Sequence, residues 1–261
     1  MSWLENSIRA LNLDPMRSLF YRALVFQHFR RDLGGPVGPY YEFGVGPGGS
    51  LVSYAHALSA LCKVGRIEES QYPIFAFDTF EGLPATNDRR DMKPGWSPGR
   101  FGDTEERVRR RVLGALSPRF RAGLHLLRGK FEETLTPRLR ESMRPCAPAI
   151  INIDCDYYSS CRTVLEWVSP LLRTGAILYF DDVWEFWGHP DYGEVAAIRE
   201  FERSGRGSLL PLAQVDFGGR CYVFVNSGEP LTFAPGGEPT LPSGGSARNQ
   251  GADHGAGIER S

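Results

Sequence analysis

Residues 40–50 read YYEFGVGPGGS and place a short apolar run directly before a cluster of glycines. A short apolar run bounded by glycine is typical of a buried strand. The residues that follow, 51–62, have helical periodicity, with Ser50 as the expected N-cap and Gly65 as the stop. A strand, a glycine-rich turn and a helix in this order predict the first unit of a parallel α/β sheet.

The same alternation continues along the chain. Further apolar runs predict strands at 74–77, 124–127, 149–153, 177–180, 210–215 and 221–225. Periodic segments predict helices at 104–116, 160–172 and around 195–201. The turn formed by residues 217–220 predicts a hairpin between the last two strands. We therefore expect five parallel strands followed by an antiparallel pair.

The chain of 261 residues is long enough for one large α/β domain. Residues 1–34 have two helical stripes and predict an N-terminal extension that covers the core, closes the site or pairs subunits. Residues 35–226 form the expected domain, and within it the Pro- and Gly-rich segment 84–102 predicts a mobile loop over the site. Residues 227–261, rich in Gly, Pro and Ser, predict a disordered tail.

Composition excludes several classes of protein. The formal net charge is −1, which gives no basic field to hold nucleic acid. No segment approaches the apolar length needed to cross a bilayer, so we expect no membrane association. Five cysteines without paired spacing argue against a disulfide framework or a zinc knuckle. These features favour a cytoplasmic protein.

The glycine-rich turn has the composition of a ligand-binding turn. Glycines let the backbone turn tightly and approach a ligand closely, and the helix behind them offers unpaired N–H groups. A plain turn or a dinucleotide-binding turn would have the same glycines. Glu42 favours another ligand, because an acid is unfavourable beside a pyrophosphate but suits the ammonium group of an amino acid.

Residues 77–84, FDTFEGLP, place Asp78 at the end of the second expected strand. An acid at this position grips the hydroxyls of a nucleoside ribose in open α/β sheets. An aspartate that only caps a turn is the competing interpretation. The spacing from the glycine-rich turn favours the ribose.

Two acidic clusters follow neighbouring expected strands. Asp154 and Asp156 end the fourth strand, and Asp181 and Asp182 end the fifth. Parallel strands end at one edge of a sheet, so these carboxylates should converge. Converging like charges repel each other unless a cation is present. Oxygen ligands select Mg²⁺, Ca²⁺ or Mn²⁺, and a hard divalent cation is predicted here.

Taken together, the segments EFGVGPGGSL, FDTFEGLP, GKFEETL, IDCDYYSS and FDD resemble the macrocin O-methyltransferase family over residues 38–205. The resemblance implies a Rossmann-like class I methyltransferase fold: a seven-stranded, mostly parallel sheet with an antiparallel last strand and helices on both faces. It also implies S-adenosylmethionine as methyl donor and Mg²⁺ or Mn²⁺ as metal.

The resemblance carries roles onto individual residues. It implies that the cofactor is bound by Glu42, Gly44, Gly46, Ser50, Asp78, Phe131 and Asp154. It implies that the metal is held by Asp154, Asp181 and Asp182, and that Asp156 is the general base. His189, in the segment after the second acidic pair, is the alternative base.

This sequence departs from the family pattern at several places. Cys155 stands where the family usually has glycine, Val183 replaces tyrosine, and Tyr157 and Ser159 replace the commoner leucine and glutamate. The segment 84–102 has its own sequence. Three aromatic residues after the second acidic pair could form a wall for a ring-shaped substrate: Trp184, Phe186 and Trp187.

The predicted function is therefore methylation of a hydroxyl on a sugar or similar small polyol, in which the metal lowers the pKa of the hydroxyl. The alternatives are a catechol or phenol O-methyltransferase, a nicotinamide-dependent oxidoreductase, a metal-dependent phosphohydrolase and a scaffold that has kept the fold. The expected partner is a small hydroxylated molecule, and the N-terminal helices favour a homo-oligomer.

Overall fold

The structure is a computed structural model that describes residues 14–31, 37–63, 65, 67–212, 219–226 and 228. Seven strands form one sheet in the order β3-β2-β1-β4-β5-β7-β6. Their bounds are β1 Tyr40–Phe43, β2 Ile74–Asp78, β3 Leu124–Arg128, β4 Ile150–Ile153, β5 Ile177–Phe180, β6 Ser208–Pro211 and β7 Arg220–Val225. The first five strands are parallel, and β7 pairs antiparallel with both β5 and β6. The expected class I methyltransferase architecture is confirmed.

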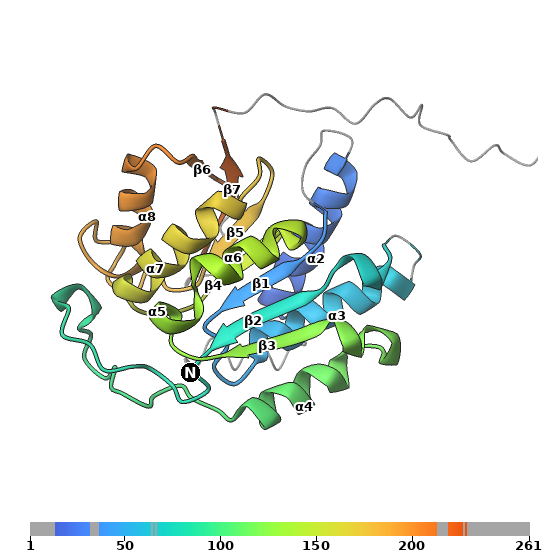
Figure 1. The fold of residues 1–261 in the computed structure, drawn as a ribbon, viewed down its shortest axis with the longest axis horizontal. Coiled ribbons are helices and arrows are strands. Elements are labelled where there is room, and N and C mark those ends of the chain that lie inside the picture. Colours follow the sequence, from blue (N-terminus) through green and yellow to red (C-terminus); the bar gives the residue numbers. More distant parts are fainter. Residues whose placement is uncertain are drawn as a thin grey trace, which may run out of the picture.

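Helices cover both faces of the sheet (Figure 1). The α-helices are α2 Pro15–Arg30, α3 Gly49–Lys63, α4 Glu105–Ala115, α5 Phe131–Thr134, α6 Pro137–Met143, α7 Tyr158–Val168 and α8 Gly193–Arg203. Short 3-10 helices lie at Glu69–Gln71, Arg89–Asp91, Pro118–Gly123, Arg144–Cys146 and Ser169–Leu171. Buried apolar residues form one core where α2, α3 and α4 pack on the sheet and another where α7 and α8 pack.

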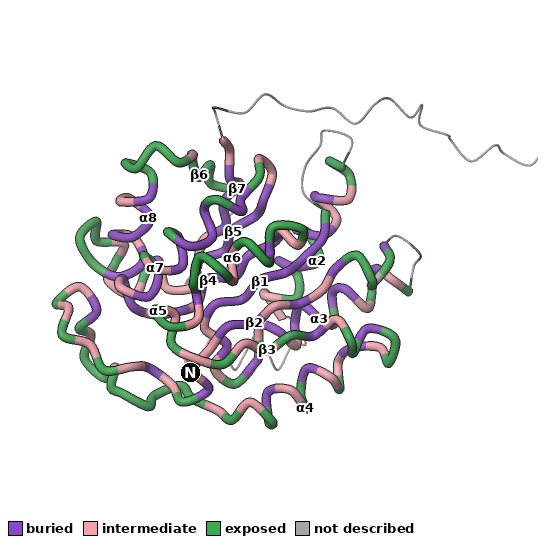
Figure 2. Tube along the Cα trace, viewed as in Figure 1, coloured by how far each residue is buried: buried purple, intermediate pink, exposed green. Residues whose placement is uncertain are grey.

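Alternation along the strands divides the side chains between these two cores. In β1, Tyr40 packs in the core with α2 and α3, whereas Tyr41 and Phe43 pack in the core with α7. All four residues of β1, β4 and β5 are buried, and Figure 2 shows the central strands buried beneath helices with exposed outer faces. The sheet is therefore rigid where it presents its strand ends.

Because β1 to β5 are parallel, their carboxyl ends lie at one edge of the sheet. The strands β4 and β5 are direct neighbours, with Ile153 opposite Phe180. This confirms that the two acidic pairs follow adjoining strands.

Three expected boundaries were wrong. Helix α3 begins at Gly49, so Ser50 lies in its first turn and is not its N-cap; the Gly48 carbonyl already accepts from Val52 N. Helix α7 begins at Tyr158 rather than at residue 160. Strand β6 ends at Pro211, earlier than expected, and the predicted hairpin at 217–220 lies partly outside the described residues.

The segment 84–102 is irregular, as expected, but it is anchored rather than loose. It leaves β2 and extends along the side of the molecule where the strands end (Figure 1). Asp91 is 1% exposed and accepts hydrogen bonds from both the backbone N and the Oγ of Ser159. The prediction of a mobile loop missed this buried contact, which joins residues far apart in the sequence.

The N-terminal extension is described only from Asp14 to Arg31, where α2 packs on α3. The remainder of that extension and nearly all of the predicted tail, 227–261, lie outside the described residues. Among the helices that the structure describes, none has the length and apolar character of a membrane span.

Candidate functional site

The glycine-rich turn after β1 is in backbone contact with the acidic segment after β4. Gly44 has φ +84°, and a Cβ placed there would lie 1.6 Å from the Asp154 carbonyl oxygen. Gly46 also has a positive φ, +49°. These conformations and this close approach favour glycine, so the turn is built to let the chain pass directly beside Asp154.

Glu42 lies beneath this turn and is fully buried. Its carboxylate accepts hydrogen bonds from Tyr40 OH and from Ser50 Oγ, each at 2.5 Å. Burial raises the pKa of Glu42 to about 8, against the opposing effect of these donors. Glu42 and Ser50 are therefore hydrogen-bonded to each other in this structure.

Asp78, at the end of β2, closes the other side of the turn. One of its oxygens, Oδ2, accepts from Val45 N at 2.5 Å and Gly46 N at 3.0 Å. The other, Oδ1, accepts from Phe80 N at 2.6 Å. The aspartate thus stabilises the turn, which is the competing interpretation from sequence. It is only partly buried.

The four predicted aspartates form one electrostatic cluster. The pKa of Asp154 is raised well above its ordinary value, first by burial and then by the charges of Asp181, Asp182 and Asp156. Burial and the neighbouring Asp156 and Asp181 likewise raise the pKa of Asp182. The pairing of β4 with β5 and the hydrogen bond from Asp156 N to Asp182 Oδ2 bring the two acidic segments together, as the sequence predicts.

Asp156 occupies a distinct position in this cluster. Its φ of +59° is left-handed, and its backbone N donates to Asp182 Oδ2 at 3.1 Å. Burial and the Asp181 charge raise the pKa of Asp156 to about 7, while the charges of Lys93 and Arg100 act in the opposite direction. Both cations come from the segment 84–102, which therefore lies close to the acidic cluster.

The predicted metal ligands adjoin without forming a coordination site. Within the described part of the chain, no group of three or more His, Cys, Asp or Glu side chains is arranged to hold a metal ion. Two of the three ligands are engaged by protein donors: Asp181 Oδ1 accepts from Tyr179 OH at 2.9 Å, and Asp182 from Asp156 N. The donor chemistry fits a hard cation, and a carboxylate that accepts one hydrogen bond can still coordinate a metal.

A fifth carboxylate, missed from sequence, supports this cluster. Glu194 at the start of α8 is fully buried and accepts from Asp182 N at 2.9 Å. Its Oε1 has no hydrogen-bond partner. An acid 14 residues beyond the end of β5 carries no local signal, because only the return of α8 to the edge brings it here.

The other two predicted side chains lie apart from the cluster. Phe131 begins α5 after β3 and packs edge-on against Phe43, with ring centroids 6.0 Å apart. His189 is exposed on a turn, where its Nδ1 accepts from Asp191 N and its ring packs against Tyr192. Both contacts join His189 to residues of its own segment.

A cavity of about 470 Å³ lies between the segment 84–102 and Tyr157. Its wall includes Lys93, Trp96 and Tyr157. The ring of Trp96 lies 5.8 Å from that of Tyr157, and the Lys93 Nζ lies 4.8 Å above Trp96. Tyr157 directly follows Asp156, but none of the four aspartates lines this cavity.

The aromatic wall expected after Asp182 is only partly present. Trp187 is 93% exposed and Trp184 is 36% exposed. Phe186 does contribute, since its ring packs edge-on against Trp96 at 5.8 Å. Sequence reasoning missed Trp96; its only signal was a bulky aromatic residue within the Pro- and Gly-rich segment, where few side chains can pack.

Comparisons with known proteins agree with this geometry. The chain matches the methyltransferase-domain family over residues 41–183. The calicheamicin methyltransferase CalS11 is 25% identical, with a TM-score of 0.56, over 75% of each chain. The O-methyltransferase NovP is 18% identical, with a TM-score of 0.56, over 80% of this chain and 79% of NovP, and shows the fold alone. No curated protein matches the chain in sequence.

Proposed function

This chain belongs to the methyltransferase-domain family, and we propose that it is an S-adenosylmethionine-dependent O-methyltransferase that methylates a hydroxyl of a sugar or similar small polyol. One observation carries the proposal. The glycine-rich turn touches the backbone of Asp154, so a ligand on the turn would lie beside the acidic cluster. A methyl donor and a hydroxyl to be activated must meet in this way.

The β1 and β2 side of the edge is the proposed cofactor half. Gly44 and Gly46 leave the turn open to close approach, and the start of α3 supplies N–H groups behind it. Asp78 would hold the ribose, with Phe131 beside the base and Asp154 at the boundary with the acceptor. Glu42 and Ser50 support the turn from below and lie nearest to the methionine part.

The β4 and β5 side is the proposed acceptor half. A ring lying in the cavity beside Trp96 and Tyr157 would bring a hydroxyl toward Asp156. The hydroxyl proton passes to the Asp156 carboxylate, the oxygen forms the new C–O bond, and the bond between sulfur and methyl breaks. His189 is the alternative proton acceptor, and it would have to leave its turn to act.

We also propose that Asp154, Asp181 and Asp182 hold a divalent cation, Mg²⁺ or Mn²⁺, when the enzyme is loaded. The support is chemical: carboxylates that raise each other's pKa gain from a shared cation. When bound, the cation would polarise the acceptor hydroxyl and lower its pKa. The hydrogen bonds from Tyr179 OH and Asp156 N would then orient two of these carboxylates.

The substrate class rests on CalS11, whose name gives it as a calicheamicin methyltransferase, and on the macrocin O-methyltransferase motifs. A catechol remains the second candidate, because its two adjacent oxygens suit the same acidic cluster. None of the five cysteines is in a disulfide, which suits a reducing location such as the cytoplasm.

The test is methyl transfer from methyl-labelled S-adenosylmethionine to methyl glycosides, nucleotide sugars and catechol, each with Mg²⁺ and with EDTA. We expect label in a glycoside-type acceptor, in larger amount with Mg²⁺. Label in catechol alone would contradict the sugar assignment. Equal rates in Mg²⁺ and EDTA would contradict the metal, and no transfer to any acceptor, with no binding of S-adenosylhomocysteine, would contradict the function as a whole.

A further inference from the structure

The segment 84–102 is held to the start of α7 by the buried carboxylate of Asp91. Asp91 Oδ1 accepts from Ser159 N at 3.1 Å, and Oδ2 accepts from Ser159 Oγ at 2.6 Å. Thr86 Oγ1 donates to the same Oδ2 at 2.8 Å. With 1% of its surface exposed, Asp91 is fully satisfied by these donors, and breaking them would leave a buried charge unpaired.

This contact supplies a cap that α7 lacks. The N-cap residue of α7 is Tyr157, whose side chain makes no capping hydrogen bond. Asp91, distant in sequence, accepts instead from an N–H of the first turn of the helix. The carboxylate also lies at the positive end of the helix, which favours it there. The loop is thus joined to the start of α7 at Ser159, two residues beyond Tyr157.

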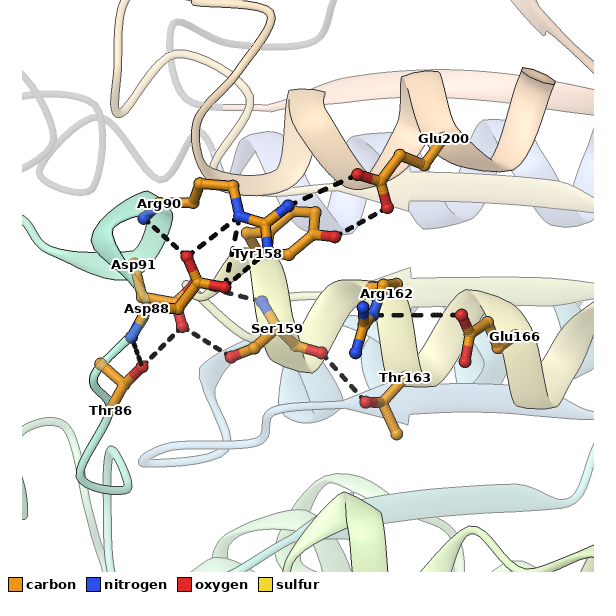
Figure 3. A network of polar contacts seen from close by, with 10 residues as sticks. All are labelled: Thr86, Asp88, Arg90, Asp91, Tyr158, Ser159, Arg162, Thr163, Glu166 and Glu200. Carbon is orange, nitrogen blue, oxygen red and sulfur yellow. Dashed lines mark hydrogen bonds and ion pairs between the residues drawn. The ribbon is translucent and has the colours of Figure 1, made fainter. Parts of the chain in front are cut away.

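A second set of contacts, formed by Arg90, Tyr158 and Glu200, lies next to the contact between Asp91 and Ser159 (Figure 3). The Arg90 guanidinium lies 3.6 Å above the ring of Tyr158, whose OH donates to Glu200 Oε2 of α8 at 2.7 Å. Arg90 also pairs with Asp88 at 2.7 Å and with Glu200 at 3.5 Å. The loop therefore touches both α7 and α8, and its short 3-10 helix is fixed against them.

Asp91 and residues on both sides of it, among them Thr86, Lys93 and Trp96, line the cavity. Lys93 pairs with Glu185 and lies over the ring of Trp96. Trp96 packs against Tyr157 and Phe186. The position of Trp96 therefore depends on a segment that Asp91 anchors to α7.

We propose that Asp91 is a positioning residue: by binding Ser159, it holds the loop so that Trp96 and Lys93 form the acceptor wall beside Asp156. The inference rests on the proposed function for the identity of the acceptor site. It predicts that acceptor binding depends on Asp91, which lines the cavity but is only 1% exposed and acts by holding the loop, and that cofactor binding does not depend on it.

The first test needs neither cofactor nor acceptor, so its result is independent of the proposed function. Hydrogen–deuterium exchange is measured on the full chain for wild type, Asp91→Ala, Asp91→Asn and Ser159→Ala. We expect exchange in peptides covering 85–98 to be about tenfold faster in Asp91→Ala. Ser159→Ala, which keeps the bond from the Ser159 N–H, should show a smaller increase, and peptides from β1 and β4 should not change.

Asp91→Asn should restore most of the protection, because its amide oxygen accepts from Ser159 N and its NH₂ can donate to Ser159 Oγ. Glu81→Gln is the matched control, since Glu81 is in an exposed ion pair with Arg128 and should alter nothing. Unchanged exchange over 85–98 in both Asp91→Ala and Ser159→Ala would overturn the proposal.

The second test separates positioning from general damage. With the fastest acceptor of the methyl glycoside and catechol series, Asp91→Ala should raise the acceptor KM about tenfold and leave the KM for S-adenosylmethionine within about twofold. Should Asp91→Ala fail to fold, Ser159→Ala should show the same selective effect at about threefold. An equal loss for donor and acceptor, or failure of Asp91→Asn to recover the acceptor KM, would contradict a positioning role.

Discussion

The ring of Trp96 joins the acceptor cavity to the sheet edge through a small set of aromatic contacts. It lies between Tyr157, which follows the acidic segment of β4, and Phe186, which follows that of β5. Flat aromatic surfaces of this kind bind the apolar face of a ring at little entropic cost. At the scale of the residue, Trp96 is therefore the side chain on which acceptor affinity should depend most.

Trp96→Ala should raise the acceptor KM about tenfold, because a stacking contact of about 1 kcal/mol or more is lost. S-adenosylhomocysteine affinity should stay within about twofold, since the cofactor half of the edge is unchanged. Trp187→Ala is the control, because Trp187 is 93% exposed. Steady-state kinetics and calorimetry measure both, and an equal effect of the two substitutions would contradict the assignment of the cavity.

Glu42 should make stability depend on pH. Burial raises its pKa from 4.5 to about 8, so the folded chain keeps a proton that the unfolded chain releases between those values. The free energy of unfolding should therefore fall as pH rises through this window, by up to about 1.4 kcal/mol per unit.

Glu42→Gln removes this titration. Relative to wild type, the variant should gain stability steadily from about pH 5 to pH 8 and no further above it. Urea unfolding at several pH values measures the difference. If the unfolding free energies of wild type and Glu42→Gln changed equally with pH across this range, Glu42 would be ionised in the folded chain, against the prediction.

At the scale of the element, the unit of β1, the glycine-rich turn and α3 fixes the distance between the two halves of the site. The turn passes so close to β4 that the chain permits no side chain at Gly44. Sequence reasoning succeeded here because glycine spacing and a buried strand are local signals. It misjudged Ser50, which donates to Glu42 inside the helix rather than capping it.

Gly44→Ala should destabilise the chain by about 3 kcal/mol or more, because the new Cβ would overlap the Asp154 carbonyl and φ is +84°. Gly114→Ala is the matched control: Gly114 lies in α4 with nothing within 4 Å of a built Cβ. That change should stabilise the chain by about 0.5 kcal/mol. Thermal unfolding measures both, and a Gly44→Ala variant as stable as wild type would contradict the close contact.

At the scale of the whole molecule, the parallel sheet divides its carboxyl edge into two halves. The strand order places Asp78 of β2 on one side of β1 and β4, and Asp181, after β5, on the other. This division was predictable, since alternating strands and helices with acids at the strand ends allow few arrangements. The convergence of Asp154, Asp156, Asp181 and Asp182 followed from the same reasoning.

The anchored loop was not predictable, because its key contact joins Asp91 to Ser159, which lie 68 residues apart in the sequence. Neither residue has a local pattern that points to the other. The same holds for Glu194, which reaches Asp182 only through the return of α8. The proposed metal ligands were inferred from their chemistry, but their present hydrogen bonds depend on side-chain rotamers that no sequence pattern specifies.

The most direct test of this division is calorimetric binding of S-adenosylhomocysteine to the full chain. Wild type should bind, Asp78→Ala should bind at least about thirtyfold more weakly, and Asp181→Ala should bind within about threefold of wild type, since only Asp78 belongs to the cofactor half. Binding that survives in Asp78→Ala but disappears in Asp181→Ala, or no binding by wild type at millimolar ligand, would contradict the account.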